Sequence, residues 1–403
     1  MMHTVVVGAS AGGLATAEGL RRLGYDGALT VVGDEAHPPY DRPPLSKQIL
    51  SGAWAPDRLP LRPPAELRAL DARWLLATAA TAVDPGTRTV SLADGEHLGY
   101  DHLVVATGVR PRRLPGAEAP LDGLHTLRTL EDALRLRARL APGRRLVVVG
   151  AGFIGAEAAA VGRGLGVRVT MVEPAPVPLA HAVGSAIGTA LSRAHLEHGV
   201  DLRTGTAVAR VLTDPAHGQV TGVELTDGST VDADDVLVGI GSLPNTEWLE
   251  GSGLPVDDGL LCDRYSAAAP RVWGVGDVAR WFNPLFGRPM RVEHRAHAAE
   301  HGLAVARNIL DAGTPRPFAP VPYFWSDQYD LKIQAYGYLR GHQQVAVIEG
   351  DLDSLHFLAA YRTGDRLSGV LAVGMPPRAV RPWRAALAAG RTWSEATSLP
   401  ATA

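Results

Sequence analysis

The feature that most constrains this chain is a succession of strand, glycine-rich turn, helix and strand that occurs twice, with turns beginning at Gly8 and Gly150. In each copy a short apolar run precedes the turn, and apolar residues at helical spacing follow it. Such a unit lays two parallel strands side by side and covers them with the connecting helix. We therefore predict an α/β fold with two Rossmann-like domains. The expected elements are strand 4–8, helix 14–23 and strand 29–32 in the first copy, and strand 145–150, helix 154–165 and strand 168–173 in the second.

The rest of the chain indicates a discontinuous first domain and a separate C-terminal region. Buried strands at 103–108 and 235–241 each follow one copy of the repeat and add a strand to that module. Alternation at 206–231 predicts short antiparallel strands, and similar alternation returns after about residue 321, with a final helix expected near Pro382. We expect the first domain to comprise 1–110 and 242–320, the second 111–241, and a C-terminal α+β domain 321–403.

Composition narrows the class of protein. Hydrophobic residues make up 46% and charged residues 20% of the chain, which is ordinary for a folded globular protein. A formal charge of −3 gives no global basic field, so we expect no nucleic-acid partner. The chain lacks an apolar run long enough to span a membrane and an N-terminal secretory pattern. We therefore expect a cytoplasmic protein without a membrane partner.

The single cysteine, Cys262, limits the redox chemistry. One thiol forms neither an intrachain disulfide nor a paired-cysteine redox centre, and it does not ligate a zinc ion or an iron–sulfur cluster alone. We predict no metal site. Basic residues are almost all Arg: of the 39 Lys and Arg residues only Lys47 and Lys332 are Lys. Because a compact ammonium differs from a planar guanidinium, Lys47 is a candidate for a role that only Lys fills.

The second turn is a complete G-x-G-x-x-G between strand and helix. The first glycine permits the tight turn, the second lets a pyrophosphate approach the backbone, and the third lets helix and strand pack closely. Glu173 follows at the end of the next strand, where a carboxylate accepts hydrogen bonds from the adenosine ribose. It would repel a 2′-phosphate, so we expect NADH to be preferred over NADPH. The binding residues that we expect are Gly150, Gly152, Phe153, Ile154, Gly155 and Glu173, with Gly241 at the end of a neighbouring strand.

The first turn is imperfect because Ser10 stands where the middle glycine would be. Serine is small and keeps its backbone N–H, so phosphate binding is retained in principle. Either Asp34 or Glu35 is the candidate ribose acid. Two such turns in one chain imply two dinucleotides, and FAD with NAD(P)H is the obvious pair. The residues that we expect at this first site are Gly8, Ser10, Gly12, Gly13, Asp34, Glu35, Thr107, Gly108, Gly276 and Asp277, the last as a partner of the FAD ribitol.

At this point the sequence resembles the bacterial ferredoxin reductases, including the putidaredoxin reductases and the reductase components of aromatic-ring dioxygenases. Besides the two turns, the segments that carry the resemblance are Pro39–Lys47, Leu103–Gly108, Val147–Glu157, Val238–Asn245, Gly274–Ala279 and Pro322–Tyr329. It covers nearly the whole chain, and R-P-P-L-S-K and F-W-S-D-Q-Y are its most specific parts. It implies a glutathione-reductase-like architecture with non-covalent FAD.

The resemblance also assigns residues. It implies that Lys47 lies near flavin N5 and pairs with Glu157, which we take as the catalytic pair. The further flavin contacts that it implies are Arg42, Val83 at the adenine, Arg128 and Trp325. The implied reaction is hydride transfer from NADH to FAD, followed by single-electron transfer to a 2Fe–2S ferredoxin that serves a haem-thiolate monooxygenase or a ring-hydroxylating dioxygenase.

The sequence departs from its relatives in places, and alternatives stay open. Relatives often carry Trp two residues after the glutamate at Glu293, where this chain has Arg295, which we expect to add positive charge facing an acidic ferredoxin. Further candidates for ferredoxin docking are Arg110, Arg112, Arg113 and Arg291. A rubredoxin as acceptor, an NADH oxidase or peroxidase, and a non-enzymatic flavoprotein module are the alternatives.

Overall fold

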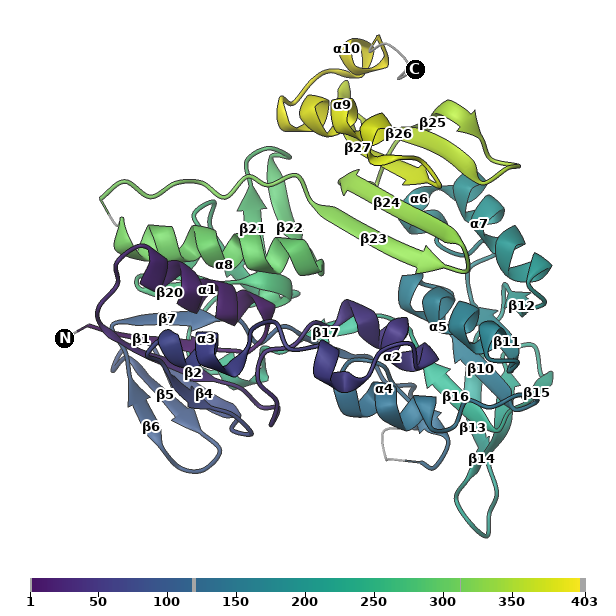
Figure 1. The fold of residues 1–403 in the computed structure, drawn as a ribbon, viewed down its shortest axis with the longest axis horizontal. Helices are drawn as coiled ribbons and strands as arrows, with labels where there is room; N and C mark the ends of the chain where they lie inside the picture. The colour runs from purple at the N-terminus through teal and green to yellow at the C-terminus, as the bar shows by residue number, and fades with distance from the viewer. Residues whose placement is uncertain (1, 118–120, 312, 399–403) are drawn as a thin grey trace. The chain divides into compact units, whose positions relative to one another are not determined.

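The computed structural model describes residues 2–117, 121–311 and 313–398 of the chain (Figure 1). It divides into two compact units, each built from three stretches of sequence. Unit 1 comprises Met1–Asp41, Leu59–Arg110 and Leu243–Pro322, and unit 2 comprises Arg42–Arg58, Pro111–Ser242 and Tyr323–Ala403. The chain enters unit 2 first at Arg42–Arg58 and again at Pro111. Which nucleotide each domain binds stays a prediction.

Unit 1 is centred on a six-stranded sheet in the order β19-β20-β7-β1-β2-β3. Strands β20, β7, β1, β2 and β3 are parallel, and β19 pairs antiparallel with β20. Helices α1 and α8 lie against each other on one face, close enough that a Cβ on Gly19 would lie 2.8 Å from the Cβ of Ala306. The bounds are β1 (His3–Val7), α1 (Ala11–Arg22), β2 (Ala28–Val32), β3 (Arg73–Leu75), β7 (His102–Val105), β19 (Ala267–Ala269), β20 (Val272–Gly274) and α8 (Arg295–Leu310).

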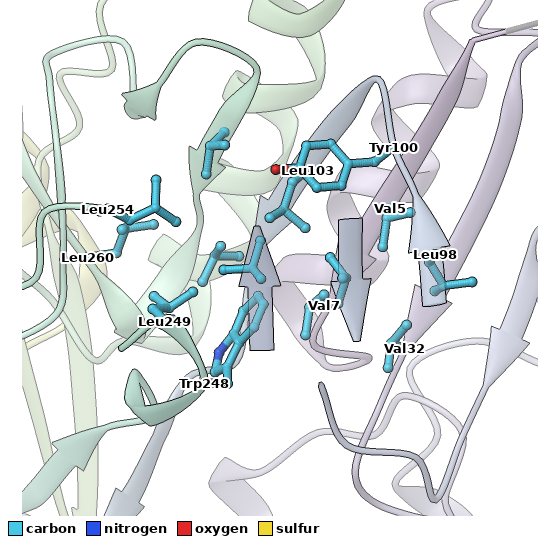
Figure 2. Close-up of a cluster of buried hydrophobic side chains, with 14 of the residues drawn as sticks. Val5, Val7, Val32, Leu98, Tyr100, Leu103, Trp248, Leu249, Leu254 and Leu260 are labelled. Atoms are coloured by element: carbon cyan, nitrogen blue, oxygen red, sulfur yellow. The ribbon is translucent and has the colours of Figure 1, made fainter. Parts of the chain in front are cut away.

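Alternation along the strands builds a core on each face of this sheet. Val6 packs towards α1 and α8, whereas Val5 and Val7 belong to a cluster on the opposite face that includes Trp248 and Leu98 (Figure 2). The other elements of unit 1 are α3 (Pro64–Ala69), β4 (Ala80–Asp84), β5 (Thr89–Leu92), β6 (His97–Gly99), η3 (Glu247–Leu249), β18 (Leu260–Cys262), η4 (Gly276–Val278), β21 (Ala279–Asn283) and β22 (Arg288–Arg291).

Unit 2 contains a second parallel sheet, in the order β12-β11-β10-β16-β9. The predicted antiparallel strands after residue 206 form a three-stranded sheet, β13-β14-β15. The bounds are β9 (Leu124–His125), α4 (Leu130–Arg137), β10 (Arg145–Val149), α5 (Phe153–Gly164), β11 (Arg168–Glu173), α6 (Ala180–Val183), α7 (Ser185–Glu197), β12 (Asp201–Thr204), β13 (Val208–Thr213), β14 (Val220–Leu225), β15 (Thr230–Asp232) and β16 (Asp235–Val238). The earlier stretch of unit 2 contributes η1 (Pro43–Ser46), α2 (Gln48–Ser51) and η2 (Pro56–Arg58). Two short strands, β8 (Val109–Pro111) and β17 (Ser242–Pro244), lie where the chain passes from one unit to the other.

The C-terminal part of unit 2 is an antiparallel sheet in the order β23-β24-β27-β26-β25. The helix expected to start near Pro382 as the final one differs from its prediction: α9 begins at Pro377 with Pro382 inside it, and a short helix, α10, follows it. Proline at the first helical position needs no backbone N–H, so Pro377 is the better start, while Pro382 removes one interior bond. The bounds are β23 (Tyr323–Gln328), β24 (Leu331–Gly337), β25 (Gln344–Asp351), β26 (His356–Thr363), β27 (Arg366–Val373), α9 (Pro377–Ala388) and α10 (Trp393–Thr397).

The two predicted βαβ units are present, and every predicted element in them overlaps an observed one within a few residues. The α/β fold class with two parallel sheets and a C-terminal sheet is therefore confirmed. Within the described residues, no helix is both long and apolar enough to cross a membrane. The same part of the chain holds no group of three or more His, Cys, Asp or Glu residues placed to bind a metal ion.

Candidate functional sites

The first candidate site lies at the carboxyl edge of the unit 1 sheet. Gly8 has φ +124°, and a Cβ there would lie 2.1 Å from the carbonyl oxygen of Ala106. A Cβ on Gly13 would lie 1.9 Å from the carbonyl oxygen of Gly8, which is the close helix–strand approach expected of the third glycine. Ser10 is the N-cap of α1, and its hydroxyl caps no backbone N–H. The first N–H groups of α1 therefore suit an anion such as a pyrophosphate.

Parallel pairing brings the other predicted residues to this edge. Strand β7 pairs with β1 and strand β20 pairs with β7, all in parallel, so Thr107 and Gly276 follow strands that point the same way as the one before Gly8. The side chain of Asn245 donates to the carbonyl of Thr107 at 2.9 Å, and the Thr107 hydroxyl donates to the carbonyl of Asn245 at 2.8 Å. The Asn245 N–H also donates to the carbonyl of Gly108 at 3.0 Å. This asparagine holds the predicted Thr107–Gly108 turn in place.

The Gly276–Asp277 turn is held by packing and by a buried histidine. A Cβ on Gly12 would lie 2.8 Å from the side chain of Val275, so this glycine lets the first loop meet the strand before Asp277. The Gly276 N–H donates to His301 Nδ1 at 3.2 Å, and His301 Nε2 donates to Ser266 at 2.7 Å. Burial lowers the pKa of His301 to about 3, so the ring is neutral and Nδ1 remains an acceptor.

The register of β1 and β2 bears on the open choice of ribose acid. Val7 pairs with Val32, so Gly33 is the residue level with Gly8 and no acid occupies that position. A Cβ on Gly33 would lie 2.6 Å from the Cβ of Ala9, which explains the glycine. Asp34 is exposed, whereas Glu35 is half-buried and accepts a hydrogen bond from Tyr40 at 2.5 Å. The structure thus offers two carboxylates here and leaves the choice between them open.

Val83 is placed differently from the other predicted residues of unit 1. It lies on β4 with 7% of its surface exposed, inside the hydrophobic cluster of Val5 and Val7. Its predicted contact with an adenine stays a prediction.

The second candidate site lies at the carboxyl edge of the unit 2 sheet. Gly150 has φ +95°, and a Cβ there would lie 2.5 Å from the carbonyl oxygen of Gly239. A Cβ on Gly155 would lie 2.2 Å from the carbonyl oxygen of Gly150. Gly241, with φ +97°, accepts the N–H of Arg112 at 2.9 Å. The loop therefore has the same backbone construction as the first one.

The side chain of Glu173, at the end of β11, is hydrogen-bonded to this loop. It is level with Gly150 because Val149 pairs with Val172, and its carboxylate accepts the N–H of Ala151 at 2.9 Å and of Ala175 at 3.0 Å. A carboxylate oxygen has two lone pairs, so ribose hydroxyl groups can be bound in addition.

The helix that follows the second loop leaves room at its N-terminus. A Cβ on Gly152, the N-cap of α5, would meet no atom within 4 Å, so the protein itself does not require glycine there. That open space in front of the helix N-terminus fits a pyrophosphate. Of the next two residues, Phe153 packs on Phe324 at 4.9 Å between ring centroids and Ile154 is 48% exposed.

A buried charged cluster lies one turn further along α5. Lys47 Nζ donates to Glu157 Oε2 at 2.7 Å, as the resemblance implied. The same oxygen accepts the Ser46 hydroxyl at 2.5 Å, and Glu157 Oε1 accepts the Ser326 hydroxyl at 2.7 Å. Glu157 is 2% exposed, so this carboxylate is buried with three donors around it. An ionised carboxylate in the interior needs such partners.

The remaining predicted residues of unit 2 are partly brought together. The Arg42 guanidinium donates to the backbone carbonyl of Arg128 at 2.8 Å, which joins two of the predicted flavin contacts. Trp325 is half-buried on β23, where its ring stacks on that of Tyr323 with 5.9 Å between the ring centroids.

The arginines expected to meet a ferredoxin are mostly paired. Arg295 Nε donates to Asp41 at 2.5 Å, and both residues belong to unit 1. Arg110 pairs with Glu247, and Arg291 pairs with Glu293 at 2.6 Å. Burial raises the pKa of the Cys262 thiol, so this cysteine stays protonated and is not a ready nucleophile.

Sequence reasoning missed several residues that support these sites. They share no motif that signals their role, although some lie inside segments that carried the resemblance. They are Ser46, Ser326, Gln328, His195 and Tyr329 around Glu157, and Asn245 and His301 beside the first loop.

Comparison with known proteins accords with this geometry. Residues 2–302 match the family model "Pyridine nucleotide-disulphide oxidoreductase", and residues 323–400 match "Reductase C-terminal". The putidaredoxin reductase CamA of Pseudomonas putida is 37% identical over 93% of this chain and 89% of its own length. The ferredoxin–NAD(+) reductase component of the p-cumate 2,3-dioxygenase system of the same species is 39% identical over 83% of this chain and 80% of its own length.

Among solved structures, the reductase in the covalent putidaredoxin reductase–putidaredoxin complex superposes with a TM-score of 0.89 and 36% identity, over 94% of this chain and 91% of that one. Matches of this extent cover both parallel sheets and the C-terminal sheet. The chain therefore belongs to the pyridine nucleotide-disulphide oxidoreductase family, and within it to the bacterial ferredoxin reductases.

Proposed function

We propose that this protein is an FAD-dependent, NADH-oxidising ferredoxin reductase. The observation that carries the proposal is the pair of glycine-rich loops with matching backbone geometry, one in each unit, of which the second has Glu173 bonded into it. The first loop is the proposed FAD site, with Gly276 and Asp277 beside it. The second is the proposed NADH site. The FAD and NAD(P) requirement is that of the family to which the chain belongs.

The residues divide the work as follows. When bound, FAD accepts two electrons with a hydride and passes electrons on singly, which an iron–sulfur acceptor requires. The two loops bind and orient the nucleotides through helix N-termini. Lys47 is held by its ion pair with Glu157. By the resemblance to the family, its positive charge would lie next to the flavin ring. Arg42 and Arg128 lie together on the same unit and are proposed to bind FAD.

The preference for NADH rests on Glu173. Its carboxylate is held by two backbone N–H groups, so it does not turn away to admit another negative group. A 2′-phosphate at that position would meet like charge in a partly buried site. Val177, four residues further along the chain, offers no compensating cation.

The proposed acceptor is a 2Fe–2S ferredoxin that serves a monooxygenase or a ring-hydroxylating dioxygenase. In support, one relative is named as a putidaredoxin reductase and another as the ferredoxin–NAD(+) reductase component of a dioxygenase system. An NADH oxidase or peroxidase that uses a redox cysteine is disfavoured because Cys262 is the single cysteine and the pKa of its partly buried thiol is raised. A rubredoxin remains the alternative acceptor.

The test is an absorbance spectrum of the purified protein followed by anaerobic titration with NADH and with NADPH. We expect bound flavin that NADH bleaches at concentrations about tenfold lower than NADPH does. A colourless protein that binds no added FAD would refute the proposal. Equal bleaching by the two nucleotides would remove only the NADH preference. Cytochrome c reduction through added ferredoxin or rubredoxin then identifies the acceptor.

The role of Arg295 in docking needs a test that respects its partner. Arg295→Gln removes a positive charge and Asp41→Asn removes a negative charge from the same ion pair. If the arginine attracts an acidic ferredoxin, Arg295→Gln lowers ferredoxin-dependent cytochrome c reduction and Asp41→Asn does not, while NADH–ferricyanide reduction is unchanged in both. Equal losses in the two variants would indicate that only the ion pair matters.

A further inference from the structure

The Lys47–Glu157 pair is one end of a longer chain of buried side chains in unit 2. Ser326, which donates to Glu157, accepts the side-chain amide of Gln328 at 3.2 Å. Gln328 Oε1 lies 3.1 Å from His195 Nε2, and His195 Nδ1 lies 2.9 Å from the Tyr329 hydroxyl. The chain thus joins α5, β23 and α7.

The sequence explains why these side chains meet. On β23 alternate residues share a face, so Phe324, Ser326 and Gln328 point the same way. On α5, Phe153 and Glu157 are four residues apart and share a helix face. Phe324 packs on Phe153, which places Ser326 opposite Glu157.

Chemistry fixes the direction of every hydrogen bond in the chain. An ionised carboxylate only accepts, so the Ser326 hydroxyl must donate to it and must accept from Gln328. The amide oxygen of Gln328 then accepts a hydrogen bond from the His195 Nε2–H, and the unprotonated Nδ1 accepts one from the Tyr329 hydroxyl. Burial lowers the pKa of His195 to about 4 and raises that of Tyr329 to about 12, so both are neutral near pH 7.

All of these dipoles point at Glu157, and the middle of the chain is shielded from water. Ser326 is 0%, Gln328 1% and His195 4% exposed. Hydrogen bonds in such a row polarise one another in a low-dielectric interior. The Gln328 amide, which lies within this row, does not relay a proton readily. The row is therefore suited to holding the Glu157 carboxylate in place and not to proton transfer.

We propose that Ser326, Gln328, His195 and Tyr329 are positioning residues that hold the Glu157 carboxylate and, through it, the Lys47 ammonium in a single place. This rests on the proposed function only in assigning Lys47 to the flavin. The four residues act through Glu157.

The protein contains only two lysines, so the ammonium group of Lys47 can be observed directly. Labelling with ¹³C,¹⁵N-lysine gives signals from Lys47 and from Lys332, which is exposed on β24. The measurement is the exchange rate of the Lys47 ammonium protons with water in the purified protein, with the Lys332 carbon signals reporting that the fold is intact. An ammonium held by a carboxylate exchanges slowly.

Ser326→Ala removes a hydrogen bond to a charged group, so we expect Lys47 exchange to accelerate by about tenfold or more. Gln328→Leu is expected to give a smaller increase, and Tyr329→Phe, which removes one distal hydroxyl, roughly twofold. The matched control is Ser192→Ala: Ser192 lines the same small hollow as His195 and Gln328, but its hydroxyl bonds to Gly188 of its own helix. It should leave the rate unchanged.

Graded acceleration with an unchanged control supports the proposal. A rate in Ser326→Ala and Gln328→Leu equal to that in Ser192→Ala would overturn it. If Gln328→Leu does not fold, the comparison of Ser326→Ala and Tyr329→Phe with the control decides. Flavin content and NADH bleaching judge the proposed function separately, since the lysine signals are read without NADH or ferredoxin.

Discussion

The two glycine-rich loops have one backbone design and differ in their acids. In each, the first glycine has positive φ and faces a carbonyl of the neighbouring strand, and the last glycine lies against the carbonyl of the first. In the second loop Glu173 is level with Gly150 and bonded to the loop. In the first, the level position is Gly33, and the candidate acids come one and two residues later.

Two loops with the same backbone geometry can therefore differ in ligand, because the groups around each loop select it. The second loop has its own acid and open space at Gly152, so its specificity is local. The first loop, the proposed FAD site, has its other candidate binding groups on neighbouring strand ends, which Asn245 and His301 hold. Near the first loop, the loss of nucleotide affinity should therefore be spread over substitutions of several residues. Near the second loop, substitution of one residue, Glu173, should cause most of the loss.

The largest expected effect comes from adding a methyl group to the first glycine of either loop. In Gly8→Ala and Gly150→Ala the Cβ meets a backbone carbonyl and the residue keeps a positive φ, so the loop must shift. We expect about a 100-fold loss of affinity for the loop's own nucleotide and little for the other. Flavin content measures the first loss, and NADH–ferricyanide reduction by the flavin-loaded protein measures the second.

The controls are Gly95→Ala and Gly143→Ala, because both glycines have positive φ, at +89° and +83°, but a Cβ there meets nothing within 4 Å. They carry the backbone strain without the clash, and nucleotide binding should be normal. A Gly150→Ala protein that purified without flavin would contradict the separation of the two sites.

The second prediction compares the acids. Glu173→Ala removes the charged acceptor of two backbone N–H groups as well as the ribose partner, so we expect NADH to bind about 30- to 100-fold more weakly. Asp34→Ala and Glu35→Ala should each weaken FAD binding by less than about tenfold, since two carboxylates are present. Isothermal titration measures each affinity.

Glu173→Gln separates the two contributions of this residue. The amide oxygen still accepts a hydrogen bond, but the charge that repels a 2′-phosphate is gone. We expect the NADH-to-NADPH preference to fall more than NADH affinity itself. An unchanged preference would assign cofactor selection to another residue.

The third prediction concerns the buried histidine that supports the first site. His301 has a pKa of about 3 in the folded protein against an ordinary value of 6.5. Its contribution to stability is therefore complete above pH 6.5 and is lost as the pH falls towards 3, because the unfolded chain binds the proton first. At pH 5 the loss is about 2 kcal/mol. His301→Gln keeps an acceptor and a donor without titrating, so urea unfolding should show a smaller drop between pH 7 and pH 5. A drop equal to that of the wild-type protein would exclude this residue as the cause.

Local pattern made the fold and both loops predictable. Strand residues such as Val5 and Val148 alternate or run apolar, the helices have their period, and the glycines mark the turns. Glu173 was predictable because its distance from Gly150 along one βαβ unit is nearly fixed. The start of α9 was predicted wrongly at Pro382 because proline more often starts a helix than lies within one. Pro377 is the proline that starts this helix.

The support of the sites was not predictable, since it depends on contacts between distant segments. Ser326 bonds to Glu157 and His195 bonds to Gln328 across long stretches of sequence, and these partners follow from how β23 packs on α5 and α7. The pairing of Arg295 with Asp41 likewise spans 254 residues. Local patterns predict which side chains share a face, but the tertiary fold decides which faces meet.

The smallest expected effect exchanges the residue that distinguishes the two motifs. Ser10→Gly should change FAD affinity less than about threefold, because the first loop already accommodates a side chain there. Gly152→Ser places a side chain where no protein atom lies within 4 Å, so the fold should be unaffected. If a pyrophosphate uses that space, NADH should bind about tenfold more weakly, or about 1.4 kcal/mol. Gly164→Ser, on the same helix with a Cβ equally free of contacts, is the matched control. Equal NADH affinity in the two serine variants would mean that the space at Gly152 is not where the nucleotide binds, and the second loop would then need the same supporting strand ends as the first.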